Sequence, residues 1–151
     1  MYKGQRRSVS LVLQCHYTAL AWLPLNRRQV CKALERMIAV LAYQGITLPG
    51  IVEVHLVDDG TISSVNIKNL NCTGPTNVLS FPGADDLPGS LLLSLNTLER
   101  ECLQYGQKIS EHLLRLLAHG MVHLAGFDHG PEMDYLCELC LDAGLAVLEV
   151  S

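Results

Sequence analysis

This chain of 151 residues has few aromatic side chains, few charges and no long apolar run. Two Phe and one Trp are too few for an aromatic core, so we expect a core of Leu, Val, Ile and Ala. The hydrophobic fraction of 49% excludes an intrinsically disordered chain. No apolar stretch reaches the ~18 residues of a membrane-spanning helix, so we expect no membrane association.

Neither sign of charge dominates the sequence, since 11 Lys and Arg residues face 15 Asp and Glu residues. A net charge of −4 argues against a protein that coats nucleic acid non-specifically, although it leaves room for a local basic groove. Repeats, low-complexity tracts and linkers are absent, which predicts a single domain over residues 1–151. The first residues are basic and then apolar, as in a signal peptide, but they alternate and lack a clear cleavage site. We interpret them as a strand and expect a cytoplasmic protein.

Six cysteines are present, but their spacing lacks the second C-x-x-C of a tetrahedral zinc site. The pair Cys137-x-x-Cys140 falls inside a predicted helix, and the others, including Cys72, are scattered along the chain. We interpret them as free thiols, mostly buried, in a reducing compartment.

The hydrophobic pattern predicts both strands and helices. Strands are expected at residues 8–17, 51–57, 76–82 and 90–95. Helices are expected at residues 26–45, 60–69, 96–105, 110–126 and 131–148, with Asn26 and Asn96 as N-caps and Ser110 and Glu111 opening the fourth helix. Because the order lacks regular βαβ alternation, we predict an α+β fold: one mixed sheet of about four strands packed with about five helices.

Three of the six histidines lie close together in the sequence "AHGMVHLAGFDHG". His119 and His123 stand four apart in a predicted helix, so they share a face about 6 Å apart. Gly126 is placed to end that helix in a left-handed turn and to bring His129 back toward them. Three imidazoles leave one tetrahedral position open, as in catalytic zinc sites, so we predict one zinc ion per chain. Nickel or another divalent metal also suits this donor set.

The other histidines, His16, His55 and His112, lack such spacing, and we expect them to be ordinary core or surface residues. The triad also fits the metalloprotease pattern H-E-x-x-H-x-x-G-x-x-H except at Gly120, where the protease carries its Glu general base. Without that carboxylate the peptidase chemistry lacks its acid and base, so a peptidase is not expected.

The sequence "HGMVHLAGFDH" (119–129) resembles the H-G-x-L-H-L-x-G-Y-D-H signature of the YbeY family of bacterial single-strand endoribonucleases. "PTNVLSFP" (75–82) resembles the second signature of that family, and "LVDDGTISSVN" precedes it in the expected order. The resemblance implies a zinc ion held by His119, His123 and His129, and metal-assisted cleavage of single-stranded RNA. It also implies 3′ maturation of 16S rRNA, quality control of the ribosome and the small ribosomal subunit as partner.

One position departs from the family pattern. Where the family typically carries a Tyr-Arg pair before the second signature, this chain has Asn69 and Leu70. A guanidinium can pair with phosphate and stabilise charge that builds on it, and leucine can do neither. Our hypothesis is that Arg115, one turn before His119, or Lys68 makes the phosphate contact instead.

Lesser roles are expected near the two signatures. Asp128 either orients a ligand histidine, by accepting a hydrogen bond from the ring nitrogen that does not bind the metal, or caps the turn. Asn77 and Ser80 either line the cleft or serve local turn chemistry, and Phe127 is expected to pack.

Two alternatives to a zinc-dependent endoribonuclease stay open. One is a non-catalytic ribosome-associated factor whose metal site is structural, which the missing Arg favours. The other is a different metallohydrolase that uses the same three histidines on another ester or amide.

Overall fold

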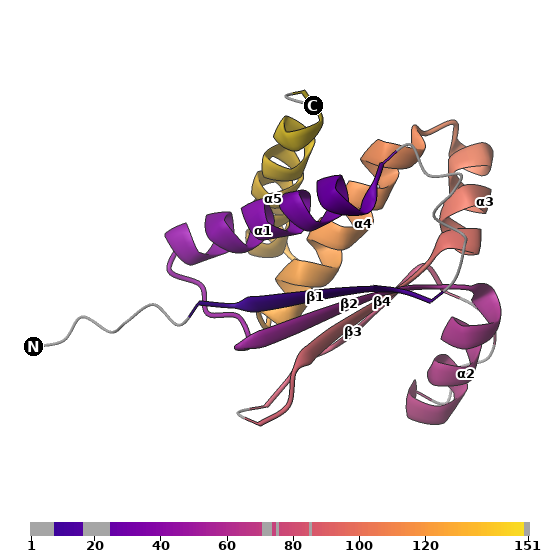
Figure 1. Cartoon of the computed structure of the whole chain (residues 1–151), viewed down its shortest axis with the longest axis horizontal. Helices are drawn as coiled ribbons and strands as arrows, with labels where there is room; N and C mark the ends of the chain where they lie inside the picture. Colours follow the sequence, from indigo (N-terminus) through magenta and orange to yellow (C-terminus); the bar gives the residue numbers. More distant parts are fainter. Residues whose placement is uncertain (1–7, 17–24, 71–73, 75, 85, 150–151) are drawn as a thin grey trace, which may run out of the picture.

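The structure is a computed structural model that describes residues 8–16, 25–70, 74, 76–84 and 86–149. These residues form four strands and five helices (Figure 1). In chain order the elements are β1 (Ser10–Cys15), α1 (Arg27–Tyr43), β2 (Ile51–Val57), α2 (Asp59–Leu70), β3 (Val78–Phe81), β4 (Gly89–Ser94), α3 (Leu95–Tyr105), α4 (Ile109–Leu124) and α5 (Pro131–Glu149). Tyr17, Cys72 and Pro75, on which some sequence expectations rest, lie outside the described residues.

The described strands form one mixed sheet in the order β1-β2-β4-β3. β1, β2 and β4 are parallel, with Leu13 opposite Val54 and Val54 opposite Leu91, whereas β3 runs antiparallel to β4. Parallel neighbours need a crossover connection, and α1 provides it between β1 and β2. The predicted α+β fold with a single mixed sheet is confirmed.

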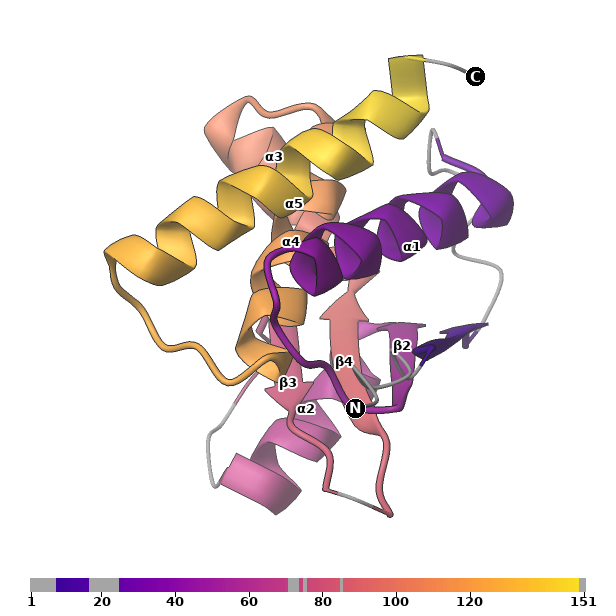
Figure 2. The ribbon, with the colours of Figure 1, turned by 90° about the vertical axis from the view of Figure 1, so that its left-hand side faces the viewer.

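One face of the sheet carries the core. Leu13, Val54 and Leu91 point to this face and are buried, and α1, α4 and α5 lie over it (Figure 1). Figure 2 shows α1 and α5 side by side in front of α4. α2 lies below the sheet in Figure 1, on the side opposite α1, α4 and α5. α4 is therefore covered by the sheet on one side and by α5 on the other.

The core is aliphatic, as the composition predicts. Leu residues dominate its fully buried members, together with Val, Ile, Ala and Met. α4 contributes ten buried residues, from His112 to Leu124. Among the described helices, none combines the length and the apolar character required to cross a bilayer.

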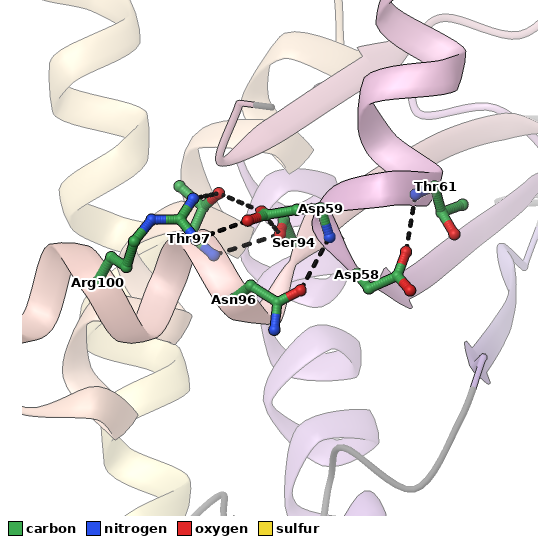
Figure 3. Close-up of polar contacts among 7 residues, drawn as sticks. All are labelled: Asp58, Asp59, Thr61, Ser94, Asn96, Thr97 and Arg100. Carbon is green, nitrogen blue, oxygen red and sulfur yellow. Dashed lines mark hydrogen bonds and ion pairs between the residues drawn. The ribbon is translucent and has the colours of Figure 1, made fainter. Parts of the chain in front are cut away.

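The helix ends agree with the sequence at α1 and differ at α3. Asn26 caps α1, and its capping box with Gln29 is complete on both sides. Asn96 was expected to cap α3, but this prediction is wrong, because Ser94 is the N-cap and accepts from the backbone N–H of Thr97. The Asn96 side chain instead accepts from the backbone N–H of Asp59 at the start of α2 (Figure 3).

Asp59 ties α2 to α3, which explains the shifted cap. Its carboxylate accepts hydrogen bonds from Ser94 Oγ at 2.7 Å, Thr97 Oγ1 at 2.7 Å and Arg100 Nη1 at 2.6 Å (Figure 3). Burial alone would raise the pKa of Asp59. The hydrogen bonds from Arg100, Ser94 and Thr97, with the Arg100 charge, outweigh it and hold that pKa below its usual value.

The helix that bears the histidine pair begins slightly earlier than expected. α4 starts at Ile109 after Lys108, whose side chain makes no cap hydrogen bond, rather than at Ser110. It ends at Leu124, and Gly126 adopts φ +94°, the left-handed conformation predicted for it. The chain therefore reverses just after His123.

Candidate metal site and cleft

Helix α4 and the turn after it bring the three predicted histidines together. His119 Nε2 and His123 Nε2 lie 3.1 Å apart, and the His129 ring centroid lies 5.3 Å from that of His119 and 5.2 Å from that of His123. One ring nitrogen from each residue lies within 4.8 Å of the others. This group could hold a metal ion.

The backbone after the helix fixes which nitrogen of His123 faces the group. His123 Nδ1 lies 2.9 Å from the carbonyl oxygen of Phe127. A carbonyl only accepts, so Nδ1 carries the hydrogen and Nε2 presents its lone pair. A metal-binding histidine typically donates its second N–H in this way, so the residues fit an ion at this position.

The pKa of His119 is lower than its usual value. Burial lowers its pKa, and repulsion by His123 and His129 lowers it further, while Asp134 acts in the opposite direction. A lowered pKa favours the neutral imidazole, which is the form that binds metal.

An open cleft of about 770 Å³ borders the histidines. Strand β3 forms one wall, α4 the other, and the turn after α4 closes one end. The lining residues are Asn77, Val78, Leu79, Ser80, Pro82, Arg115, Leu116, His119, His123, Gly126, Phe127, Asp128 and His129. Asn77 and Ser80 thus line the cleft, and Ser80 Oγ also donates to the Gly120 carbonyl oxygen at 3.3 Å, joining β3 to α4.

Gly120, where a metalloprotease carries its Glu, faces the sheet. A Cβ at this position would lie 2.9 Å from Leu91 Cδ2 and 3.4 Å from Val78 Cγ2. A side chain at this position would therefore have to displace Leu91 in the core, so the packing of α4 on the sheet favours glycine here.

Arg115 and Lys68, the two predicted phosphate contacts, lie in different places. Arg115 lines the cleft, half exposed, and its guanidinium lies 3.2 Å from Glu111 Oε1. Lys68 is exposed near the end of α2 and is not among the described residues that line the cleft. Leu70, where the resemblance implies an Arg, is the last residue of α2 and is 49% exposed.

Asp128 lines the cleft and is exposed, but within the described chain it makes no hydrogen bond to the three histidines. The neighbouring Phe127 carbonyl orients His123 instead. A backbone acceptor leaves no mark in the sequence, so this contact could not be predicted.

The sequence also did not predict a hydrogen-bonded group of polar side chains behind the cleft wall, formed by Asn77, Glu101 and His112. Asn77 Nδ2 donates to Glu101 Oε2 at 3.4 Å, and His112 Nε2 lies 3.4 Å from the same oxygen. Glu101 Oε1 and His112 Nδ1 are buried without a hydrogen-bond partner in the described structure. Asn77 Oδ1 accepts from the Val78 backbone N–H at 2.7 Å, so both ends of its amide are held.

The cysteines that the structure describes are free. Burial raises the pKa of Cys137 to about 11 and that of Cys140 to about 12. Thiolates are the reactive and metal-binding form, so this pair is chemically inert near neutral pH, as the sequence indicated.

Fold and site together define an α+β protein whose three-histidine group could hold a metal ion beside an open cleft. Residues 22–136 match the sequence profile of the family described as "Endoribonuclease YbeY". The chain belongs to the YbeY endoribonuclease family, which confirms the resemblance of its two signatures.

Individual relatives of this chain carry the name of the same family. The "Endoribonuclease YbeY" of Nitratidesulfovibrio vulgaris is 40% identical over 149 residues, 83% of this chain and 90% of that protein. The protein of the same name from Lawsonia intracellularis is 46% identical over 116 residues, 76% of this chain and 83% of that protein. A solution structure of TM1509 from Thermotoga maritima shares the fold, with a TM-score of 0.67 and 19% identity over 93% of this chain and 92% of that one.

Proposed function

We propose that this chain is a zinc-dependent endoribonuclease that cleaves single-stranded RNA in the cytoplasm. Family membership supports RNA cleavage, since the curated relatives are named endoribonucleases. We further propose that its substrate is 16S rRNA at the 3′ end, and that it acts on the small ribosomal subunit in maturation and quality control. The observation that carries the proposal is the convergence of three imidazole donors on one side of an open cleft.

His119, His123 and His129 would hold one divalent ion. Such an ion, when bound, supplies a Lewis acid that polarises a phosphoryl oxygen and neutralises charge developing on it. The chain's own contribution is to fix the donors: α4 positions two of them, and the Phe127 carbonyl holds His123 in the metal-binding tautomer. Nickel or another divalent metal suits the same donors.

Arg115 is our candidate for the contact to an RNA phosphate. It stands one helical turn before His119 and lines the same cleft, so its guanidinium can reach a phosphate close to the histidines. Glu111 competes for it across an exposed ion pair at 3.2 Å, which is a weak interaction that a phosphate can replace. Lys68 is proposed as a second cation for RNA flanking the cleft.

The test compares cleavage of a single-stranded RNA by the wild-type chain, His123→Ala and Glu99→Gln, an exposed residue outside the cleft, with zinc measured in each preparation. We expect cleavage and one zinc per chain in the wild type, loss of both in His123→Ala, and no change in cleavage in Glu99→Gln. Chelation should abolish cleavage, and added zinc should restore it. Cleavage that survives both chelation and His123→Ala would contradict the proposal.

A second candidate is a non-catalytic ribosome-associated factor whose metal is structural. Leu70 favours it, because an exposed leucine stands where the family typically carries Arg. Bound zinc and binding to the small subunit, without cleavage, would support this candidate. Leu70→Arg would then be expected to create cleavage.

A further inference from the structure

A second pair of histidines meets on the other side of the sheet. His16 follows β1 directly, and its backbone N–H donates to the Leu56 carbonyl oxygen at 3.1 Å, so the register with β2 continues to this residue. His55 lies within β2, opposite Gln14. His16 Nε2 lies 2.8 Å from His55 Nδ1.

Glu53 sets the protonation pattern of this pair. Its Oε2 lies 3.3 Å from His55 Nε2 and accepts the hydrogen of that nitrogen. His55 Nδ1 then presents its lone pair toward His16 Nε2. A carboxylate on the outer nitrogen of an imidazole is the arrangement that orients histidines toward metals.

In the described structure the contact between the two nitrogens is a hydrogen bond in which His16 Nε2 donates to His55 Nδ1, and an ion bound by both nitrogens would take the place of that hydrogen. With bonds of about 2.0 Å, nitrogens 2.8 Å apart enclose an angle of about 90°. A right angle between imidazoles is the geometry of square-planar or tetragonal sites, which Cu²⁺ and Ni²⁺ prefer.

The pair is separate from the three-histidine group. In β2, Val54 and Leu56 point into the core under the helices, so the alternating residues Glu53 and His55 point to the opposite face. The cleft lies on the helix side at β3, and β1 and β3 are the two edges of the described sheet. The His55 side chain is 18% exposed and that of Glu53 33%, so an ion can enter from solvent and keep water in its remaining positions.

We propose that His16 and His55 form a second metal site for a late divalent transition metal such as Cu²⁺ or Ni²⁺, with Glu53 as the positioning residue for His55. The site goes beyond the proposed nuclease function and does not depend on it. No RNA measurement bears on it, so the two proposals can fail independently.

Copper binding to the full metal-free chain tests the site. The background is the double variant His119→Ala with His123→Ala, which disables the three-histidine group. To it we add His16→Asn or His55→Asn, with Ser10→Ala, an exposed residue on the same face of β1, as the matched control. Cu²⁺ is titrated against a competing chelator, and electron paramagnetic resonance counts the nitrogen ligands.

We expect the background and the Ser10→Ala chain to bind one Cu²⁺ with two imidazole nitrogens. Either histidine substitution should remove that equivalent, and Glu53→Gln should weaken it about 10- to 100-fold. The wild-type chain should bind one equivalent more than the background. The proposal would be overturned if His16→Asn and His55→Asn left copper binding to the background chain unchanged. It would also be overturned if the copper bound by the background chain had fewer than two imidazole nitrogens.

Discussion

The Nδ1–H of His123 points at the carbonyl oxygen of Phe127, four residues later, at 2.9 Å. This contact exists because Gly126, between the two residues, turns the chain back with φ +94°. Gly126 therefore has two effects on His123. It ends helix α4, and it places the Phe127 carbonyl oxygen where it accepts the Nδ1 hydrogen and fixes the tautomer.

Gly126→Ala tests that relationship. A Cβ at a positive φ is strained, so we expect a loss of about 1 kcal/mol in the free energy of unfolding and a shift of the Phe127 carbonyl. Zinc affinity should fall about 10-fold or more, as for other lost hydrogen bonds to ligand histidines. Zinc competition assays measure it, with Gly130→Ala, where a Cβ meets no atom within 4 Å, as the control. Equal affinities in both variants would contradict the role of the turn.

Arg115 should bind RNA more tightly when Glu111 no longer competes for it. We therefore expect Glu111→Gln to strengthen binding to single-stranded RNA and Arg115→Ala to weaken it. The slope of log affinity against log salt should fall in magnitude by about 0.7 for Arg115→Ala, because one phosphate contact is lost. Lys68→Ala is compared in the same titration. If Arg115→Ala and Lys68→Ala both leave RNA binding and cleavage unchanged, neither residue contacts phosphate.

Gly120→Ala should destabilise the fold rather than alter the site chemistry. The added Cβ would lie 2.9 Å from Leu91 in a buried contact between α4 and β4, so overpacking should cost about 1–3 kcal/mol. Denaturant unfolding measures the change, with Gly50→Ala as a control at a position with no atom within 4 Å. The zinc content of the folded fraction should not change. A neutral Gly120→Ala would show that the helix and the sheet can separate there.

Asp59 should make stability depend on pH in the acid range. Its pKa in the folded chain lies below the unfolded value of about 3.9, so its stabilisation is complete above that value and disappears as pH falls through the folded-state pKa. Asp59→Asn should therefore cost about 1–3 kcal/mol at pH 7 and progressively less in acid. Unfolding curves from pH 7 to pH 2 measure this, with the exposed Glu99→Gln as control. A constant difference across that range would argue against the ion pair with Arg100 as its cause.

Glu101 should act on the cleft through Asn77. We expect Glu101→Ala to destabilise the chain by about 1–3 kcal/mol and to lower RNA cleavage, because the Asn77 amide loses its acceptor. A double-mutant cycle with Asn77→Ala should give a coupling energy of about 0.5 kcal/mol or more. Additive effects of the two substitutions would indicate that Glu101 has only a structural role.

Local geometry explains which features the sequence could predict. His119 and His123 are one helical turn apart and Gly126 ends that helix, so their approach to His129 follows from short-range rules. The N-cap of α3 could not be predicted in this way. Ser94 and Asn96 stand two positions apart and can both cap a helix, and only their hydrogen bonds to Asp59, which is distant in the sequence, decide which of them does.

Contacts between strands lie beyond such reasoning. His16 and His55 are 39 residues apart, and each alone resembles an ordinary surface histidine. Only the parallel register of β1 and β2 brings their rings together. The same holds for Gly120, whose crowded environment comes from Leu91 on a strand distant in the sequence.

The burial of α4 has a thermodynamic consequence. Two of the three candidate ligands stand on the helix that the sheet and α5 enclose, so they cannot separate while the core is intact. An ion bound there would stabilise the folded chain, and each tenfold excess of metal over its dissociation constant would add about 1.4 kcal/mol to the free energy of unfolding. The amides of α4 should accordingly be among the last in the chain to exchange with deuterium, and their exchange should be slower still when metal is bound.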